Sequence, residues 1–202
     1  VWAAAHDDSY DHFFRLHVFA TFSGSHASEL VQTDVRNVLD NAHKGYFVTG
    51  GTKRDHRSRP VIIVNETHKD LLLKFSGDCK SGFRSICGHR ANQTESNHSR
   101  LLKKELQRAT GNPKLTAYCL RHTGKHLGEI KGLSNLPAFE RIFGWVEGRP
   151  RIKDDYARAG IFAAPMIAAY RDITDKLIED LPDCNEPTPA ATRAKVVELH
   201  KR

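Results

Sequence analysis

The sequence lacks the features that mark membrane and secreted proteins. It contains no run of about 18 apolar residues, which argues against a transmembrane helix. It opens with no positively charged segment followed by an apolar stretch, so secretion is unsupported. Four cysteines in 202 residues are too few for a disulfide framework. We therefore expect reduced thiols in an intracellular, cytoplasmic protein that binds no membrane.

The sequence also lacks the common motifs for nucleotides, hydrolysis and zinc. Gly50-Gly51-Thr52-Lys53 is without the upstream glycine of a nucleotide-binding loop, and no Gly-x-Ser-x-Gly hydrolase turn occurs. The spacing of the one Cys/His-rich segment contains neither Cys-x-x-Cys nor a paired-histidine motif, which argues against zinc binding by Cys79, Cys87, His89 and His98. We expect no cofactor, nucleotide or metal.

What the chain does have is an excess of basic residues. Its 31 Lys and Arg against 24 Asp and Glu give a formal net charge of +7. This balance favours a polyanionic partner, nucleic acid before a membrane surface. A basic protein with ordinary surface charge is the alternative.

The pattern of apolar residues predicts a mainly helical α+β fold. Two β-branched and aromatic runs, 46–49 and 61–64, predict a small antiparallel hairpin with a cationic loop. Gly24 is predicted to end the first long helix, and residues 76–98 to form an irregular segment. Helices are predicted over 9–20, in short pieces over 27–39, from about 67, and over 99–109, 117–130, 137–144 and 166–181.

The length allows one large or two small domains. We assign residues 1–181 to one domain and 182–202 to a C-terminal tail interrupted by prolines. The chain begins at Val1 rather than at methionine, so we expect a fragment or processed product that lacks N-terminal domains.

One predicted helix carries four polar or ionisable side chains at helical spacing. Tyr118, Arg121, His122 and Lys125 are spaced at i, i+3, i+4 and i+7, which places them on one helical face. We expect this face to point outward and the apolar positions to face inward, namely Leu120, Leu127 and Ile130. The alternative is a solvated basic face without further function.

A tyrosine downstream of an arginine suits phosphodiester transfer. A phenol has a pKa of about 10, so it must lose its proton as it attacks phosphorus. Charge then builds on the non-bridging oxygens, which a planar guanidinium binds bidentately. The departing 5′-oxygen needs a proton, and a lysine ammonium can supply it.

These pieces occur in the order found in tyrosine recombinases, the phage-integrase family, which the chain resembles. The likeness spans about residues 10–160 and leaves 76–98 unmatched. It rests on five segments that resemble family motifs: Ser23–Leu30, Gly51–Val61, Leu120–Thr123, Phe143–Trp145 and Asp154–Arg158. The resemblance implies a catalytic domain over 1–181 that performs site-specific DNA recombination, integrating or excising a mobile element, as a homotetramer on two DNA sites.

The resemblance also implies a role for each matched residue. Tyr156 would attack the scissile phosphate and form a 3′-phosphotyrosine. Arg121 would bind a non-bridging oxygen, and Lys53 would protonate the 5′-oxygen. Trp145 would support the phosphate pocket through its indole N–H. Glu29 would lie behind the pocket and orient its neighbours.

Two positions depart from the family pattern. His26 stands where a second arginine is expected, and an imidazole lacks the bidentate fork. A natural variant, an inactivating change and a wrong alignment register are the three explanations, and we favour an impaired site over a wrong register. Tyr118 stands where most members carry histidine or lysine, so His122 would take more of the acid–base load, although Tyr118 can also be plain packing.

Basic clusters provide candidate contacts to a DNA backbone, which give affinity and salt dependence without sequence choice. Ordinary surface charge is the alternative for Lys103 and Lys104. The arginines expected to contact DNA are Arg54, Arg57, Arg59, Arg149 and Arg151. Two other functions stay open: a catalytically impaired DNA-binding module that retains the scaffold, and a type IB topoisomerase. The helix over 166–181 is expected to dock on a neighbouring protomer or to pack on its own domain.

Overall fold

The computed structural model describes residues 1–49, 60–76, 85–88, 95–143 and 164–182. Within these residues the chain is mainly helical with one two-stranded antiparallel sheet, as the sequence predicts. In chain order the elements are α1 (Trp2–His6), α2 (His12–Thr21), α3 (Ala27–Val31), α4 (Val35–Leu39), the 3₁₀ turn η1 (Ala42–Lys44), β1 (Tyr46–Val48), β2 (Pro60–Ile62), α5 (Glu66–Leu73), α6 (Glu95–Thr110), α7 (Ala117–Ile130), α8 (Pro137–Phe143) and α10 (Ala164–Ile178).

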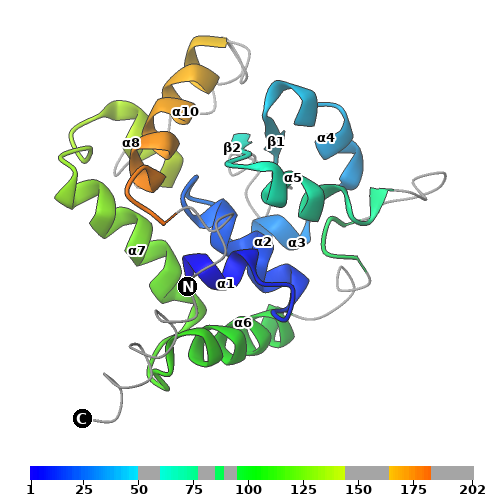
Figure 1. Cartoon of the computed structure of the whole chain (residues 1–202). Helices are drawn as coiled ribbons and strands as arrows, with labels where there is room; N and C mark the ends of the chain where they lie inside the picture. The colour runs from blue at the N-terminus through cyan, green and yellow to red at the C-terminus, as the bar shows by residue number, and fades with distance from the viewer. Residues whose placement is uncertain (50–59, 77–84, 89–94, 144–163, 183–202) are drawn as a thin grey trace.

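Helix α2 lies in the middle of the molecule, with α1, α5, α6 and α7 packed around it (Figure 1). Almost every side chain of α2 is buried because the helix has neighbours on all sides. Asp11 caps its first turn, since the carboxylate accepts the backbone N–H of Phe13 at 2.8 Å. The helix predicted over 9–20 is therefore confirmed, with its start at His12.

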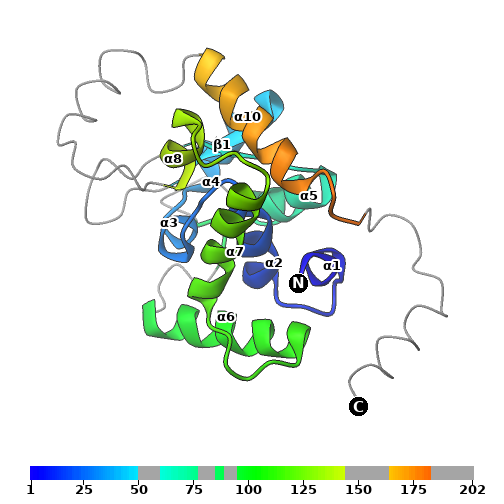
Figure 2. The ribbon, with the colours of Figure 1, turned by 90° about the vertical axis from the view of Figure 1, so that its left-hand side faces the viewer.

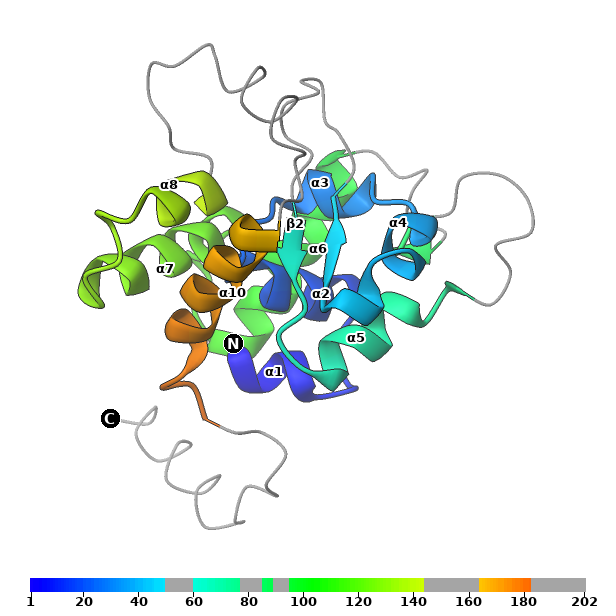
Figure 3. The ribbon, with the colours of Figure 1, turned by 90° about the horizontal axis from the view of Figure 1, so that it is seen from above.

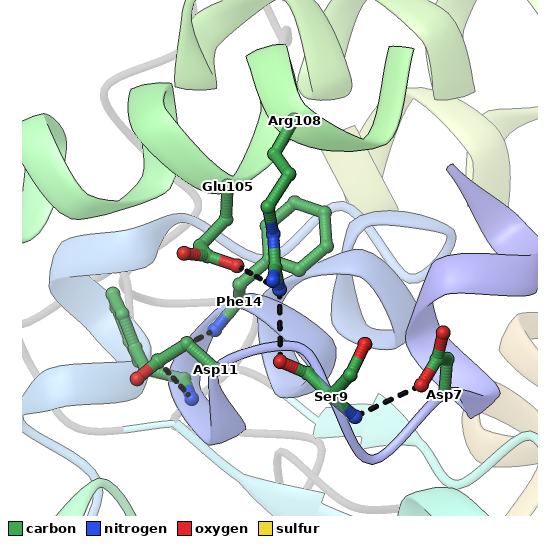
Figure 4. A network of polar contacts seen from close by, with 7 residues as sticks. Asp7, Ser9, Asp11, Phe14, Glu105 and Arg108 are labelled. Atoms are coloured by element: carbon green, nitrogen blue, oxygen red, sulfur yellow. Dashed lines mark hydrogen bonds and ion pairs between the residues drawn. The ribbon is translucent and has the colours of Figure 1, made fainter.

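Helix α6 runs crosswise beneath α7 and α2 (Figure 2). A polar network fixes it to the turn before α2 (Figure 4). Arg108 donates to the carbonyl oxygen of Ser9 at 2.9 Å and to Glu105 on its own helix at 2.6 Å. Its guanidinium also lies 3.9 Å from the centre of the Tyr10 ring. This anchoring holds the C-terminal end of α6 against the turn before α2.

The hairpin lies between α10 on one side and α4 on the other (Figure 3). Its register pairs Tyr46 with Ile62 and Val48 with Pro60, which confirms the predicted hairpin. Helix α10 packs on β2 and α8, and Arg171 donates to the carbonyl oxygen of Gly45 at 3.0 Å. The amphipathic face of α10 is thus buried within its own domain.

Three local predictions were wrong. Helix α6 begins at Glu95, so the segment predicted as irregular ends earlier and Ser99 lies inside the helix. Arg121 is buried rather than outward-facing, because two main-chain carbonyls of other segments accept its N–H groups. Ile130 is exposed rather than inward-facing, since it lies at the last turn of α7, beyond the packed part of the helix.

No helix in the described part of the chain is long and apolar enough to span a membrane.

A buried histidine sits between α2 and the hairpin. The His68 ring stacks on Phe19 at 5.2 Å and meets Phe47 edge-on at 5.9 Å. Its Nδ1 accepts the backbone N–H of Val64, so the neutral ring fits this position. Burial lowers the pKa of His68 from 6.5 to about 3.

This lowered pKa predicts acid sensitivity. In the unfolded chain His68 takes up a proton near pH 6.5, whereas in the folded chain it does so only near pH 3. The contribution of the neutral, buried ring to the free energy of unfolding is therefore complete above about pH 6.5 and is lost as the pH falls from 6.5 to 3. The slope from this one group is up to about 1.4 kcal/mol per pH unit. In urea titrations, His68→Leu should make the free energy of unfolding depend less steeply on pH, whereas His43→Gln, at an exposed position, should leave that dependence unchanged. Equal slopes in both variants would contradict the assignment.

Gly24 is predicted to be irreplaceable because two costs coincide there. Its φ of +71° is strained for other residues, and an added Cβ would overlap the carbonyl oxygen of Ile142. Gly111 is the matched control, with φ +68° and no atom within 4 Å of an added Cβ. In urea unfolding, Gly111→Ala should cost about 1 kcal/mol and Gly24→Ala at least about 2 kcal/mol more. Equal losses would show that the Ile142 contact is unimportant.

Candidate functional site

Five segments of the chain meet around a cavity of about 360 Å³. It opens where the start of α7 faces the α2–α3 connection and the first half of α6. Its lining comes from α2 (His17), the connection (Ser25, His26), α3 and the residue after it (Ala27, Ser28, Val31, Gln32), α6 (His98, Ser99) and α7 (Ala117, Tyr118, Arg121).

Arg121 is the charged group of this cavity that is held most tightly. Its Nη1 donates to the carbonyl oxygen of Gly24 at 2.9 Å, and its Nη2 donates to the carbonyl oxygen of Phe143. The side chain is buried, and both of these acceptors are neutral main-chain groups. The guanidinium plane is therefore fixed in the wall without neutralisation by these two partners.

His26 and Glu29 form a local unit at the start of α3. The buried Glu29 carboxylate accepts the backbone N–H of His26 at 2.8 Å, which is the reciprocal half of a helix capping box. Glu29 does not line the cavity, whereas His26 does. The carboxylate thus fixes the backbone that presents the imidazole.

Tyr118 and His122 lie one turn apart on the exposed side of α7. Their ring centres are 4.4 Å apart with an edge-on geometry. Tyr118 is 58 % exposed and lines the cavity, while His122 is exposed and lies outside the lining. The phenol therefore has access both to the cavity and to solvent.

Two ionisable residues of the lining were not among the predicted site residues. His17 and His98 are both buried, and the ring of Phe13 contacts each of them. The pKa of His17 falls from 6.5 to about 3, chiefly through burial and then through the charges of His26 and Arg121. The available signal for His17 was its position between Leu16 and Val18, in a helix rich in aromatic residues. His98 carried none, because it was placed in an irregular segment.

Within the described residues, no group of three or more His, Cys, Asp or Glu side chains is arranged to hold a metal ion. The cavity gathers imidazoles, a phenol and a guanidinium.

The structure brings together His26, Tyr118 and Arg121 of the predicted site, with Glu29 behind them and His122 beside them. The other predicted site residues lie outside the described part of the chain: Lys53, Arg54, Arg57, Arg59, Trp145, Arg149, Arg151 and Tyr156.

Arg121 should stabilise the fold as well as line the cavity. Lysine in its place can reach only one of the two carbonyls, so the hydrogen bond to the other is lost. Arg121→Lys should lower the free energy of unfolding by about 1–3 kcal/mol. Arg141→Lys, an exposed site on α8, should change it by less than about 0.5 kcal/mol. Urea unfolding measures both, and indistinguishable values would contradict the bridging role.

Comparisons of this chain with protein-family models, curated proteins and solved structures find no match.

Proposed function

We propose that this chain is a catalytic domain of the tyrosine recombinase type, which cleaves and rejoins DNA through a 3′-phosphotyrosine. One observation carries the proposal. Arg121 and His26, from motifs far apart in the sequence, line one cavity together with Tyr118. The family resemblance requires these positions to converge on one phosphate, and their convergence supports it.

The reaction balances without an external energy source. The Tyr156 phenol attacks phosphorus as its proton passes to the Tyr118–His122 pair, the bond from phosphorus to the 5′-oxygen breaks, and Lys53 gives that oxygen a proton. Arg121 stabilises the charge on a non-bridging oxygen, with Trp145 donating beside it. Rejoining reverses the step, since the phosphotyrosine bond retains the energy of the phosphodiester.

Other residues of the cavity act around this step. Tyr118 relays or donates a proton, and the neighbouring His122 shares that load. His26 takes the place of a second arginine and gives at most one hydrogen bond to a phosphate oxygen. Loss of one preorganised donor typically costs about 10²–10³ in rate. Glu29 is a positioning residue, because it acts through the backbone of His26.

The proposed partner is double-stranded DNA inside the cell, bound by a homotetramer on two sites. The net charge of +7 supports a polyanionic partner. Of the basic side chains, Lys103 and Lys104 lie exposed on α6, the helix that also contributes His98 to the cavity. Backbone contacts from such residues would position DNA without reading its sequence.

A second candidate function is a DNA-binding module that retains the scaffold without strand cleavage. The observation that favours it is His26 itself, which starts a helix where the reaction calls for a permanent cation. Arg121 would then serve binding alone.

A covalent-capture experiment tests the proposal. The protein is incubated with a labelled pool of nicked duplexes of randomised sequence, in which the released strand diffuses away, and denaturing gels detect a protein–DNA adduct. Wild type should form the adduct, Tyr156→Phe should form none, and Tyr118→Phe should form it more slowly. An adduct that persists in Tyr156→Phe would contradict the assigned nucleophile.

The same assay separates the two candidates. An adduct that appears only with His26→Arg, while wild type binds DNA without forming one, would favour the DNA-binding module. No adduct from either protein would exclude the cleavage chemistry. Relaxation of supercoiled plasmid by a monomer would instead indicate a type IB topoisomerase.

A further inference from the structure

The cavity around Arg121 has a one-sided charge character. Its ionisable side chains in the described lining are Arg121 and Tyr118 from α7, His26 from the start of α3, His17 from α2 and His98 from α6. No carboxylate occurs among these described lining residues, and Glu29 is engaged behind the wall by the backbone of His26. Such a lining suits an anion.

Two of the imidazoles have unused hydrogen-bonding capacity. His17 Nδ1 and His98 Nε2 are each buried and have no hydrogen-bond partner among the described residues. Both side chains are more than nine-tenths buried, so bulk water does not compensate them. Both rings line the cavity, but neither of these nitrogens is exposed to it as the rings lie, so a turn of either ring would bring its nitrogen to a hydrogen-bond acceptor bound there, once that nitrogen carries a proton.

The cavity's own charges keep His17 neutral when no ligand is bound. Burial lowers its pKa most, and His26 and Arg121 lower it further. An entering anion opposes both causes, because it brings an opposite charge and a hydrogen-bond acceptor. A unit negative charge about 4 Å away, at an effective dielectric constant of about 20, strengthens proton binding about a thousandfold. This is comparable to the lowering that burial imposes.

We propose that this cavity binds a phosphate-class oxyanion together with a proton, which His17, His98 and His26 share. The inference rests on the proposed function, since the oxyanion in the recombination reaction would be the scissile phosphate. It deepens that function, because imidazoles that become positively charged when the oxyanion binds would supply part of the positive charge of the second arginine. Binding is then stronger at lower pH.

Sulfate is the probe, because its charge stays constant over the range in which histidine titrates. Calorimetric titrations at about pH 5.5 and about pH 7.5 should give at least about fourfold tighter sulfate binding at the lower pH. Repeating them in two buffers of different ionisation enthalpy should show about one proton taken up per sulfate. Circular dichroism at each pH verifies that the protein stays folded.

Variants identify the groups that take up the proton. His17→Gln and His98→Gln should each reduce the proton uptake and bring the two affinities closer together. His126→Gln is the matched control, since His126 is exposed on α7 outside the cavity lining. His98→Gln alone decides the matter if His17→Gln fails to fold. Sulfate binding that is absent, that does not change with pH, or whose proton uptake is equal in all variants would overturn the inference.

The two proposals fail separately. Proton-coupled sulfate binding without any DNA adduct would contradict strand cleavage and leave the anion site in place. An adduct formed by a protein whose sulfate affinity does not change with pH would retain strand cleavage and overturn the coupling.

Discussion

The buried guanidinium of Arg121 is the interaction on which the arrangement of this molecule depends. It comes from α7 and donates to the carbonyl oxygens of Gly24 and Phe143. Those carbonyls end two different segments, the turn after α2 and helix α8. One planar group therefore ties three parts of the chain together at the wall of the cavity. The absence of a side chain at Gly24 makes the close approach of α8 possible, because a Cβ there would overlap the carbonyl oxygen of Ile142.

The choice of partners matters for chemistry as much as for stability. A buried arginine is often compensated by a carboxylate, which would cancel its charge toward an incoming anion. Arg121 donates to two carbonyl oxygens, which satisfy N–H groups by their dipoles without cancelling the positive charge. Fixed in this way, the group suits binding of a phosphate oxygen. The fold and the proposed function thus draw on the same contacts.

Local patterns predicted those parts of the fold whose cause is local. The hairpin follows from two β-branched and aromatic runs, and α7 begins directly after Thr116, as capping preferences indicate. The sequence did not predict the start of α6 at Glu95, because residues 95–98 are polar and give no apolar periodicity. They extend a helix whose other end is held by the hydrogen bond from Arg108 to Ser9. Tertiary contacts overrode the weak local signal there.

The site was predictable only in part for the same reason. Motif order indicated that His26, Glu29 and Arg121 belong together, and the structure brings them together. Helical spacing placed Arg121 on an outward face, since a charged residue is expected in water. Its burial depends on carbonyls of two distant segments, which no spacing along α7 reveals. His17 and His98 reach the cavity through the crossing of α6 over α2, which is equally non-local.

The histidines bear on the second arginine that the resemblance to tyrosine recombinases leads us to expect where His26 stands. An arginine carries its charge at all times, so two of them facing each other in an empty cavity repel. An imidazole is neutral when burial and Arg121 disfavour its charge, and it becomes charged when an anion arrives. Without a bound anion, the cavity then avoids the repulsion between two permanent positive charges. In exchange, it binds anions more weakly at high pH. His26 is, in this interpretation, one member of a set of titratable groups, and its effect on activity depends on His17 and His98 as well as on its own side chain.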